Sequence, residues 1–200
     1  MIYEFRITLL DVGVPVWRDI QIDDGSSFSD LHFAIQAAFN WLDFQLHQFE
    51  LIVSEGKKIA PILLESLDDE DEHFEPDEAE IEEYHPLRDY FQKQGDTAVY
   101  TYNFEEKWEH EIVLTKIVAP AEDTVYPICT GAENLAPEEE HTRKAIRKKK
   151  IKLAYENSEE IVASINLEFA FLTNTDFEDT NLEFNEEYGI DDSWDDGMPF

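Results

Sequence analysis

The sequence has one cysteine, few basic residues and no long hydrophobic run. The single Cys129 excludes an intramolecular disulfide framework. No apolar stretch approaches the length that crosses a membrane. The N-terminus, MIYEFRITLL, alternates and carries charges at Glu4 and Arg6, which is not the pattern of a signal peptide. We therefore expect a cytoplasmic protein with no membrane-spanning segment.

Positive charge is also scarce, because 15 Lys and Arg stand against 47 Asp and Glu, a formal net charge of −32 at pH 7. Such a surface repels nucleic-acid phosphates, whose neutralisation by Lys and Arg supplies most non-specific affinity. Residues 65–83 contain no Lys or Arg, and no basic residue follows Lys152. General nucleic-acid binding is therefore disfavoured, and a basic protein is the expected partner.

The remaining residues are patterned like those of a folded domain. Residues 2–10 and 16–22 alternate between apolar and polar side chains, which predicts a β-hairpin. Ser27, with Asp30 three residues later, resembles a capping box. Apolar residues at helical spacing follow, so an amphipathic helix is predicted at about 28–40, packed against the sheet.

Further elements follow along the chain. Alternation predicts strands at 47–53, 97–104 and 108–118, and a proline start predicts a short helix at 86–93. The segment 65–85 has too many acids and too few apolar residues to pack, which predicts a mobile acidic insert.

The C-terminal part is predicted to be an extension of this domain. The basic sequence RKAIRKKKIK (143–152) favours a helix within 138–154, and INLEFAFLTN (165–174) is expected to add a strand or to lie across the surface. The fold class is therefore α+β, a mainly antiparallel sheet of hairpins with a packed helix and a helical, acidic C-terminal extension. The predicted organisation is a domain at 1–140 that contains the acidic insert, then a basic helix and an acidic tail at 141–200.

Several polar side chains fall on the inward faces of these elements. His110 shares a strand face with Trp108, His47 shares one with Phe49, and His32 lies on the core edge of the predicted helix. The predicted pocket consists of Arg18, His32, His47, Tyr102, Trp108 and His110.

Two interpretations of this pocket remain open. In the first, His32, His47 and His110, with Cys129, are metal ligands or acid–base groups. In the second, each histidine bonds a carbonyl or carboxylate within a polar seam, and Arg18 pairs with an acid. No compact ligand spacing such as HExxH or CxxC is present, so packing is preferred and the sequence identifies no cofactor.

One basic cluster matches the chemistry of phosphate binding. Arg143, Lys144, Arg147 and Lys148 are its candidate contacts to nucleic acid. Pairing of this cluster with an acidic segment is at least as well supported, since acids outnumber bases threefold. No Walker loop, GxGxxG or GxSxG is present, so phosphate-cradle and hydrolase-elbow chemistry are unsupported.

Five blocks, in order, resemble the plasmid pRiA4b ORF-3-like family over roughly residues 1–140. They are PVWRDI (15–20), SDLHFAIQAAFNW (29–41), LHQFEL (46–51), YTYNFEEKWEHEI (100–112) and YPICTGAENLAPEE (126–139). The resemblance implies association with mobile elements, because members are often labelled resolvase-like passengers of transposons. The chain departs from the family pattern at Asn103 and Glu105, where members commonly carry Asp and Gly. Only Cys129 remains of a cysteine cluster, so a zinc site at that block would be weakened or lost.

The residues themselves do not support resolvase activity. A serine resolvase needs an activated serine among arginines, whereas Ser26, Ser27 and Ser29 stand at a helix start and only two arginines precede Arg88. Capping explains these serines. The sequence therefore predicts a non-catalytic interaction domain, associated with mobile elements, that binds a basic partner through its acidic surface. A metal-dependent or acid–base enzyme and a nucleic-acid-associated protein are the alternatives.

Overall fold

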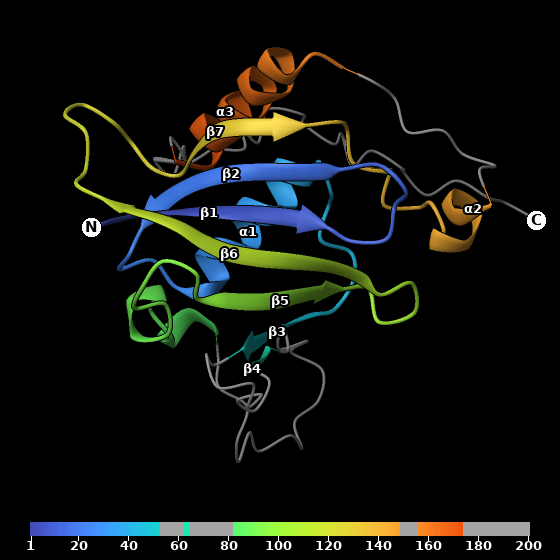
Figure 1. The fold of residues 1–200 in the computed structure, drawn as a ribbon, viewed down its shortest axis with the longest axis horizontal. Helices are drawn as coiled ribbons and strands as arrows, with labels where there is room; N and C mark the ends of the chain where they lie inside the picture. The colour runs from blue at the N-terminus through green and yellow to red at the C-terminus, as the bar shows by residue number, and fades with distance from the viewer. Residues whose placement is uncertain (53–61, 65–81, 149–155, 174–200) are drawn as a thin grey trace, which may run out of the picture.

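A computed structural model describes residues 1–52, 62–64, 82–148 and 156–173. Its seven antiparallel strands form one sheet in the order β4-β3-β5-β6-β1-β2-β7 (Figure 1). The strands are β1 (Ile2–Leu9), β2 (Val16–Asp23), β3 (His47–Ile52), β4 (Ile62–Leu64), β5 (Thr97–Tyr102), β6 (Trp108–Val118) and β7 (Ile128–Glu133). The helices are α1 (Phe28–Phe39), α2 (Arg143–Arg147) and α3 (Ser158–Thr173), with short 3-10 turns η1 (Glu82–Tyr84) and η2 (Leu87–Asp89).

The predicted α+β class, with a mainly antiparallel sheet and a packed helix, is confirmed. Strand β1 pairs along its length with β2 on one side and β6 on the other, so that Leu9 lies opposite both Val16 and His110. Strands β5 and β6 lie at two of the predicted strand positions and pair as a second hairpin. The N-terminal strand therefore lies inside the sheet rather than at its edge.

Helix α1 covers one face of the sheet (Figure 1), and the period-two alternation directs large apolar side chains toward it. Phe5, Ile7, Ile20, Phe49 and Leu114 are fully buried in this layer. No helix of the described residues lies over the opposite face. The sequence pattern thus decides which side chains lie between sheet and helix.

Helix α1 begins with the predicted capping box. Ser27 Oγ accepts the Asp30 N–H at 3.1 Å, and the Asp30 carboxylate accepts the Ser27 N–H at 2.7 Å. Two backbone donors at the helix start are thereby satisfied. The helix ends at Asn40, which adopts a left-handed conformation with φ 56°.

Replacing Ser27 with alanine is expected to lower the free energy of unfolding by about 1 kcal/mol, because the Asp30 N–H loses its acceptor. Chemical denaturation of both proteins measures this difference. The matched control is Ser29→Ala in the same helical turn, where alanine is the better helix former and the change should stay below about 0.5 kcal/mol. Equal effects at both positions would contradict the capping role.

The helix predicted at 86–93 is wrong in length, since only the turn η2 forms. The backbone N–H groups of Leu87 and Arg88 donate outward, to the carbonyls of Ser26 and Asp24. The N–H groups of Gln92 and Lys93 donate to the Asp96 carboxylate. The first N–H groups of any helix lack an intrahelical partner, so it is the use of the Gln92 and Lys93 N–H groups by Asp96 that ends the helix here.

The C-terminal elements also differ from expectation. Of the helix predicted within 138–154, the structure describes α2, and residues 149–155 lie outside the described part. The strand considered for 165–174 is wrong, because most of this segment belongs to α3. Buried Ile161, Ile165 and Phe169 of α3 follow at four-residue spacing and join the common core.

Strand β7 was not predicted, and it pairs with β2 at one edge of the sheet, where α3 lies beside it (Figure 1). Of the acidic insert predicted at 65–85, residues 65–81 lie outside the described part of the chain. The last residues of the insert include the turn η1. Among the described helices, none combines the length and apolar character required to cross a bilayer.

Candidate functional site

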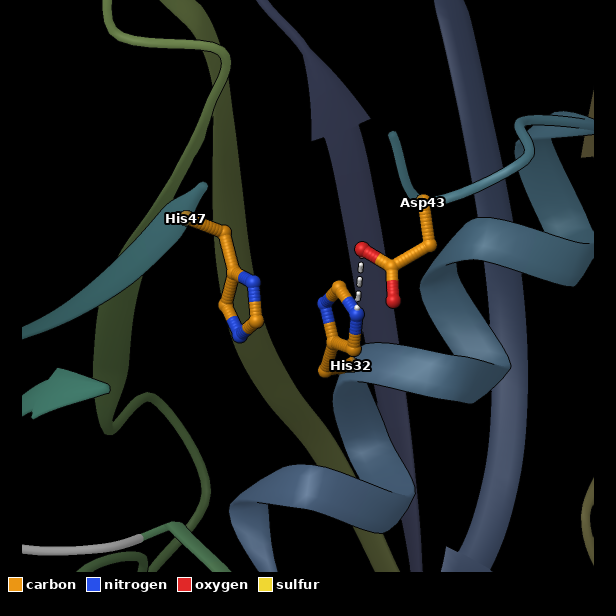
Figure 2. A group of neighbouring side chains, drawn as sticks. All are labelled: His32, Asp43 and His47. Carbon is orange, nitrogen blue, oxygen red and sulfur yellow. Dashed lines mark ion pairs between the residues drawn. The ribbon is translucent and has the colours of Figure 1, made fainter. Parts of the chain in front are cut away.

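Two histidines meet beneath α1, at the end of the sheet where β3 begins. His32 comes from α1 and His47 from β3, and their rings are stacked with centroids 3.6 Å apart and planes inclined by 7°. Figure 2 shows the two rings face to face, with Asp43 on the far side of His32. Both histidines are buried, as the inward pattern predicted.

Tyr100 of β5 anchors His32 from the sheet side. The Tyr100 hydroxyl lies 2.8 Å from His32 Nδ1 and accepts a hydrogen bond of 2.8 Å from Gln36 Nε2. Burial raises the pKa of Tyr100 well above its usual value, so the phenol keeps its proton at neutral pH. The Tyr100 hydroxyl therefore fixes the His32 ring in orientation without adding a charge.

A carboxylate faces each of the two histidines. Asp43, in the loop after α1, places Oδ1 at 3.1 Å from His32 Nε2, and its N–H donates to Gln36 Oε1 at 3.2 Å. The carboxylate of Glu82, a buried residue of η1, contacts His47 Nε2. The acidic insert thus contributes at least one side chain to the buried cluster.

His110 is not part of this group. It is fully buried on β6, with its ring edge-on to Phe39 and Trp41, and Nδ1 lies 3.2 Å from the Trp108 carbonyl oxygen. Burial lowers its pKa to about 3, so the ring is neutral at physiological pH. The Tyr100 ring contacts all three histidines, with its centroid 5.4 Å from that of His110, 5.8 Å from that of His32 and 5.6 Å from that of His47.

The packing interpretation expected buried Arg18 to pair with an acid, but among the described residues its partners are backbone carbonyl oxygens. Its guanidinium donates to the carbonyl oxygens of Ala38, Trp17, Glu133 and Asn134 at 2.8 to 3.2 Å. Burial lowers its pKa to about 10, which still leaves it charged. This side chain links the end of α1 to the end of β7.

Cys129, on β7, also lies outside the histidine group. Its Sγ is 3.4 Å from the Gly131 carbonyl oxygen, and burial raises the pKa of the thiol to about 11. A thiol in this state is a poor nucleophile and a poor metal ligand at neutral pH. Within the described residues, the one group of converging metal-ligand types is His32, Asp43 and His47.

The aromatic members of the predicted pocket pack beside the histidines. Trp108 is fully buried, and Trp41 stacks on Tyr102 with centroids 5.3 Å apart. The Tyr102 hydroxyl donates to the Glu139 carboxylate, and burial together with this neighbour raises the pKa of Tyr102. Trp108 and Tyr102 are therefore both core residues, and the Tyr102 hydroxyl contacts Glu139 of the partly exposed segment that follows β7.

At that surface a groove of about 450 Å³ opens beside the loop that follows α1. The Glu139 carboxylate accepts the Leu42 N–H at 2.8 Å and the Phe44 N–H at 3.4 Å, which holds the loop in place. The side chains of Leu42 and Phe44 are nevertheless 68% and 72% exposed. The described lining holds no Lys or Arg but includes four acids: Glu106, Glu138, Glu139 and Glu140.

The basic cluster is partly engaged within the chain. Arg143 donates its backbone N–H to the Glu106 carboxylate at 2.9 Å, and its guanidinium pairs with Asp11 at 2.9 Å. Lys144 and Lys148 are exposed, and the side chain of Arg147 lies outside the described part. Arg143 is therefore not a free phosphate contact.

Sequence reasoning missed Asp43, Glu82 and the anchoring roles of Tyr100 and Gln36. Asp43 lies in NWLDFQ, which resembles an ordinary exposed exit loop. Tyr100 had a usable signal, because it alternates with Tyr102 on a predicted strand and pairs opposite His110 in the observed register.

Comparison with known proteins places these features in a family context. The family model described as plasmid pRiA4b ORF-3-like protein matches residues 1–168, which includes most of α3. Among solved structures, the protein of unknown function MM3350 from Methanosarcina mazei Go1 is similar at 30% identity and a TM-score of 0.61. That match covers 74% of this chain and 78% of the other. No protein of curated function matches.

Proposed function

This chain belongs to the plasmid pRiA4b ORF-3-like family of uncharacterised proteins, and for this member we propose a non-catalytic role in which the groove beside Leu42 and Phe44 binds a basic, amphipathic segment of a partner protein. The carrying observation is the pairing of exposed apolar side chains with an acid-only charged lining. The family's plasmid name favours a role as an accessory of mobile elements.

The apolar part of the groove supports contact with a partner. Leu42, Phe44 and, next to them in sequence, Leu46 are all exposed, and Phe104 is exposed in the neighbouring turn. The Asn103 N–H donates to the Leu46 carbonyl oxygen at 2.9 Å, which holds this turn against the loop. Exposed apolar side chains that gather within a polar rim are typical of protein interaction sites.

The acidic part supports a basic partner. Glu138 and Glu140 are exposed, the described lining contains no Lys or Arg, and His141 in that lining lies 3.5 Å from Glu138. A Lys- or Arg-rich segment would find complementary charge here, and the chain's net charge of −32 would raise its association rate.

The loop that carries these groups is held before binding. The Glu139 carboxylate accepts hydrogen bonds from two backbone N–H groups of the loop and from the Tyr102 hydroxyl. The Asp43 N–H donates to the Gln36 side chain. A preorganised loop loses less conformational entropy when a partner binds, which favours affinity. The engaged state of Arg143, by contrast, does not favour nucleic acid as the ligand.

The proposal is tested with a labelled helical peptide of alternating Lys and Leu faces, whose binding is followed by fluorescence anisotropy. The double variant Leu42→Ser, Phe44→Ser is expected to weaken binding about tenfold or more, because it removes the apolar anchors. The double variant Glu138→Gln, Glu140→Gln should bind the peptide more weakly. Its affinity should also fall less than that of the wild type when the salt concentration is raised to about 0.5 M.

The matched control is Leu167→Ser with Phe171→Ser on α3, which removes two similarly exposed apolar side chains outside the groove. Binding should be unchanged in this control. Failure of the peptide to bind at low ionic strength, or equal binding by the groove and α3 variants, would refute the groove as the binding site.

A further inference from the structure

We propose that His32, Asp43 and His47 form a binding site for a divalent transition metal ion, with Zn²⁺ as the ion to test. These side chains come from α1, from the loop after it and from β3, and one ligand atom of each lies within 4.8 Å of the others. Figure 2 shows Asp43 and His47 on opposite sides of the His32 ring. The site is independent of the proposed partner groove, although both use the same loop.

The most direct indication is an unsatisfied atom. His32 Nε2 is buried and has no hydrogen bond of acceptable geometry, although Asp43 Oδ1 is only 3.1 Å away. Buried polar atoms without a partner are uncommon in native proteins, and each one calls for an explanation. A metal ion bound to both atoms provides one.

In each histidine, the ring nitrogen that would not bind the metal already contacts a polar side chain. His32 Nδ1 contacts the Tyr100 hydroxyl, which leaves Nε2 for a metal. His47 Nε2 contacts Glu82, which leaves Nδ1. A metal-bound histidine donates the N–H of its second nitrogen to an acceptor, often a carboxylate, and this hydrogen bond orients the ring and raises its basicity.

The distances are compatible with tetrahedral coordination after a small movement of His47. Bonds of about 2.0–2.1 Å to zinc set the ligand atoms about 3.3 Å apart. The 3.1 Å between His32 and Asp43 already corresponds to one such edge. The stacked rings lie in nearly parallel planes, and the lone pair of an imidazole nitrogen lies in its ring plane. His47 must therefore tilt out of the stack to reach the same ion.

The donor set selects the class of ion. Two imidazoles and one carboxylate suit zinc and its first-row neighbours, whereas Ca²⁺ and Mg²⁺ prefer oxygen ligands. Three protein ligands leave a fourth position open. Asp43 is about one-third exposed, so this position is reachable from solvent.

Calorimetric titration of the full chain with ZnCl₂ tests the site, in a buffer with excess Ca²⁺ that saturates the oxygen-only sites of an acidic surface. We expect one equivalent of Zn²⁺ to bind. Asp43→Asn is expected to lower the affinity more than tenfold, because it replaces a charged ligand by a neutral one of the same shape. His47→Gln is expected to abolish stoichiometric binding.

Asp123→Asn is the matched control, because Asp123 is also an exposed loop aspartate with positive φ, 55° against 57° for Asp43. It should bind Zn²⁺ like the wild type. Circular dichroism checks the fold of the His47 variant, and Asp43→Asn keeps the test decisive if that variant unfolds. Absence of stoichiometric Zn²⁺, or equal affinity in the wild type and Asp43→Asn, overturns the proposal.

Discussion

Replacing Arg18 with alanine is expected to lower the free energy of unfolding by about 3 to 5 kcal/mol. The buried guanidinium satisfies four backbone carbonyl oxygens, at the end of α1, on β2 and at the end of β7. A truncated side chain leaves acceptors without donors and a cavity against Phe39, whose ring lies 5.0 Å from the guanidinium carbon. Urea denaturation of the variant and the wild type measures the loss.

Arg6 supplies the matched control on the neighbouring strand. It donates two hydrogen bonds to Asp19 and stacks 4.0 Å over Trp17, but its side chain is 44% exposed. Arg6→Ala should therefore change stability by less than about 1 kcal/mol. Similar losses at both arginines would mean that the carbonyl contacts of Arg18 add nothing to ordinary surface pairing.

Acid is expected to destabilise the fold through His110. Burial lowers the pKa of His110 to about 3 in the folded state, against about 6.5 in the unfolded chain. Between these values the unfolded chain binds a proton that the folded chain does not. The contribution of neutral His110 to the free energy of unfolding is therefore fully present above pH 6.5. It is lost as the pH falls below that value, with a slope approaching about 1.4 kcal/mol per pH unit.

His110→Phe should flatten this slope, because the ring is retained among Phe39 and Trp41 while the titrating group is removed. Unfolding free energies measured from pH 7 to pH 4 give the comparison. Phe39→Leu is the control, since it perturbs the same cluster and should lower stability by a similar amount at every pH. An unchanged slope in His110→Phe would show that other groups cause the acid sensitivity.

The sequence predicted those strands and helices whose buried side chains recur with a regular period along the chain. Alternation located β1, β2, β5 and β6, and the Ser27–Asp30 pattern located the start of α1. Strand β7 was missed because ICTGAE includes a glycine and follows a proline, so its strand character comes from pairing with β2. Helix α3 is not evident from INLEFAFLTN alone, because its four-residue spacing of buried residues begins before that segment, at Ile161.

For the candidate site, the sequence predicted that the histidines are buried but not which of them lie together. Strand and helix phase placed His32, His47 and His110 inward, and all three are buried. Which of them converge depends on β3 lying next to β5 beneath α1, a relation between segments distant in sequence. Asp43 was missed for the same reason, because a loop acid looks solvated until tertiary packing brings it to His32.

The position of β1 between β2 and β6 has a consequence for how fast the chain folds. Each hairpin forms from neighbouring residues, but the β1–β6 pairing joins residues about a hundred positions apart and is the step that unites the sheet. Closing so long a loop is entropically unfavourable before any contact compensates for it. Folding should therefore be slow for a domain of this size, in the millisecond-to-second range of high-contact-order topologies, with the two hairpins forming before they associate.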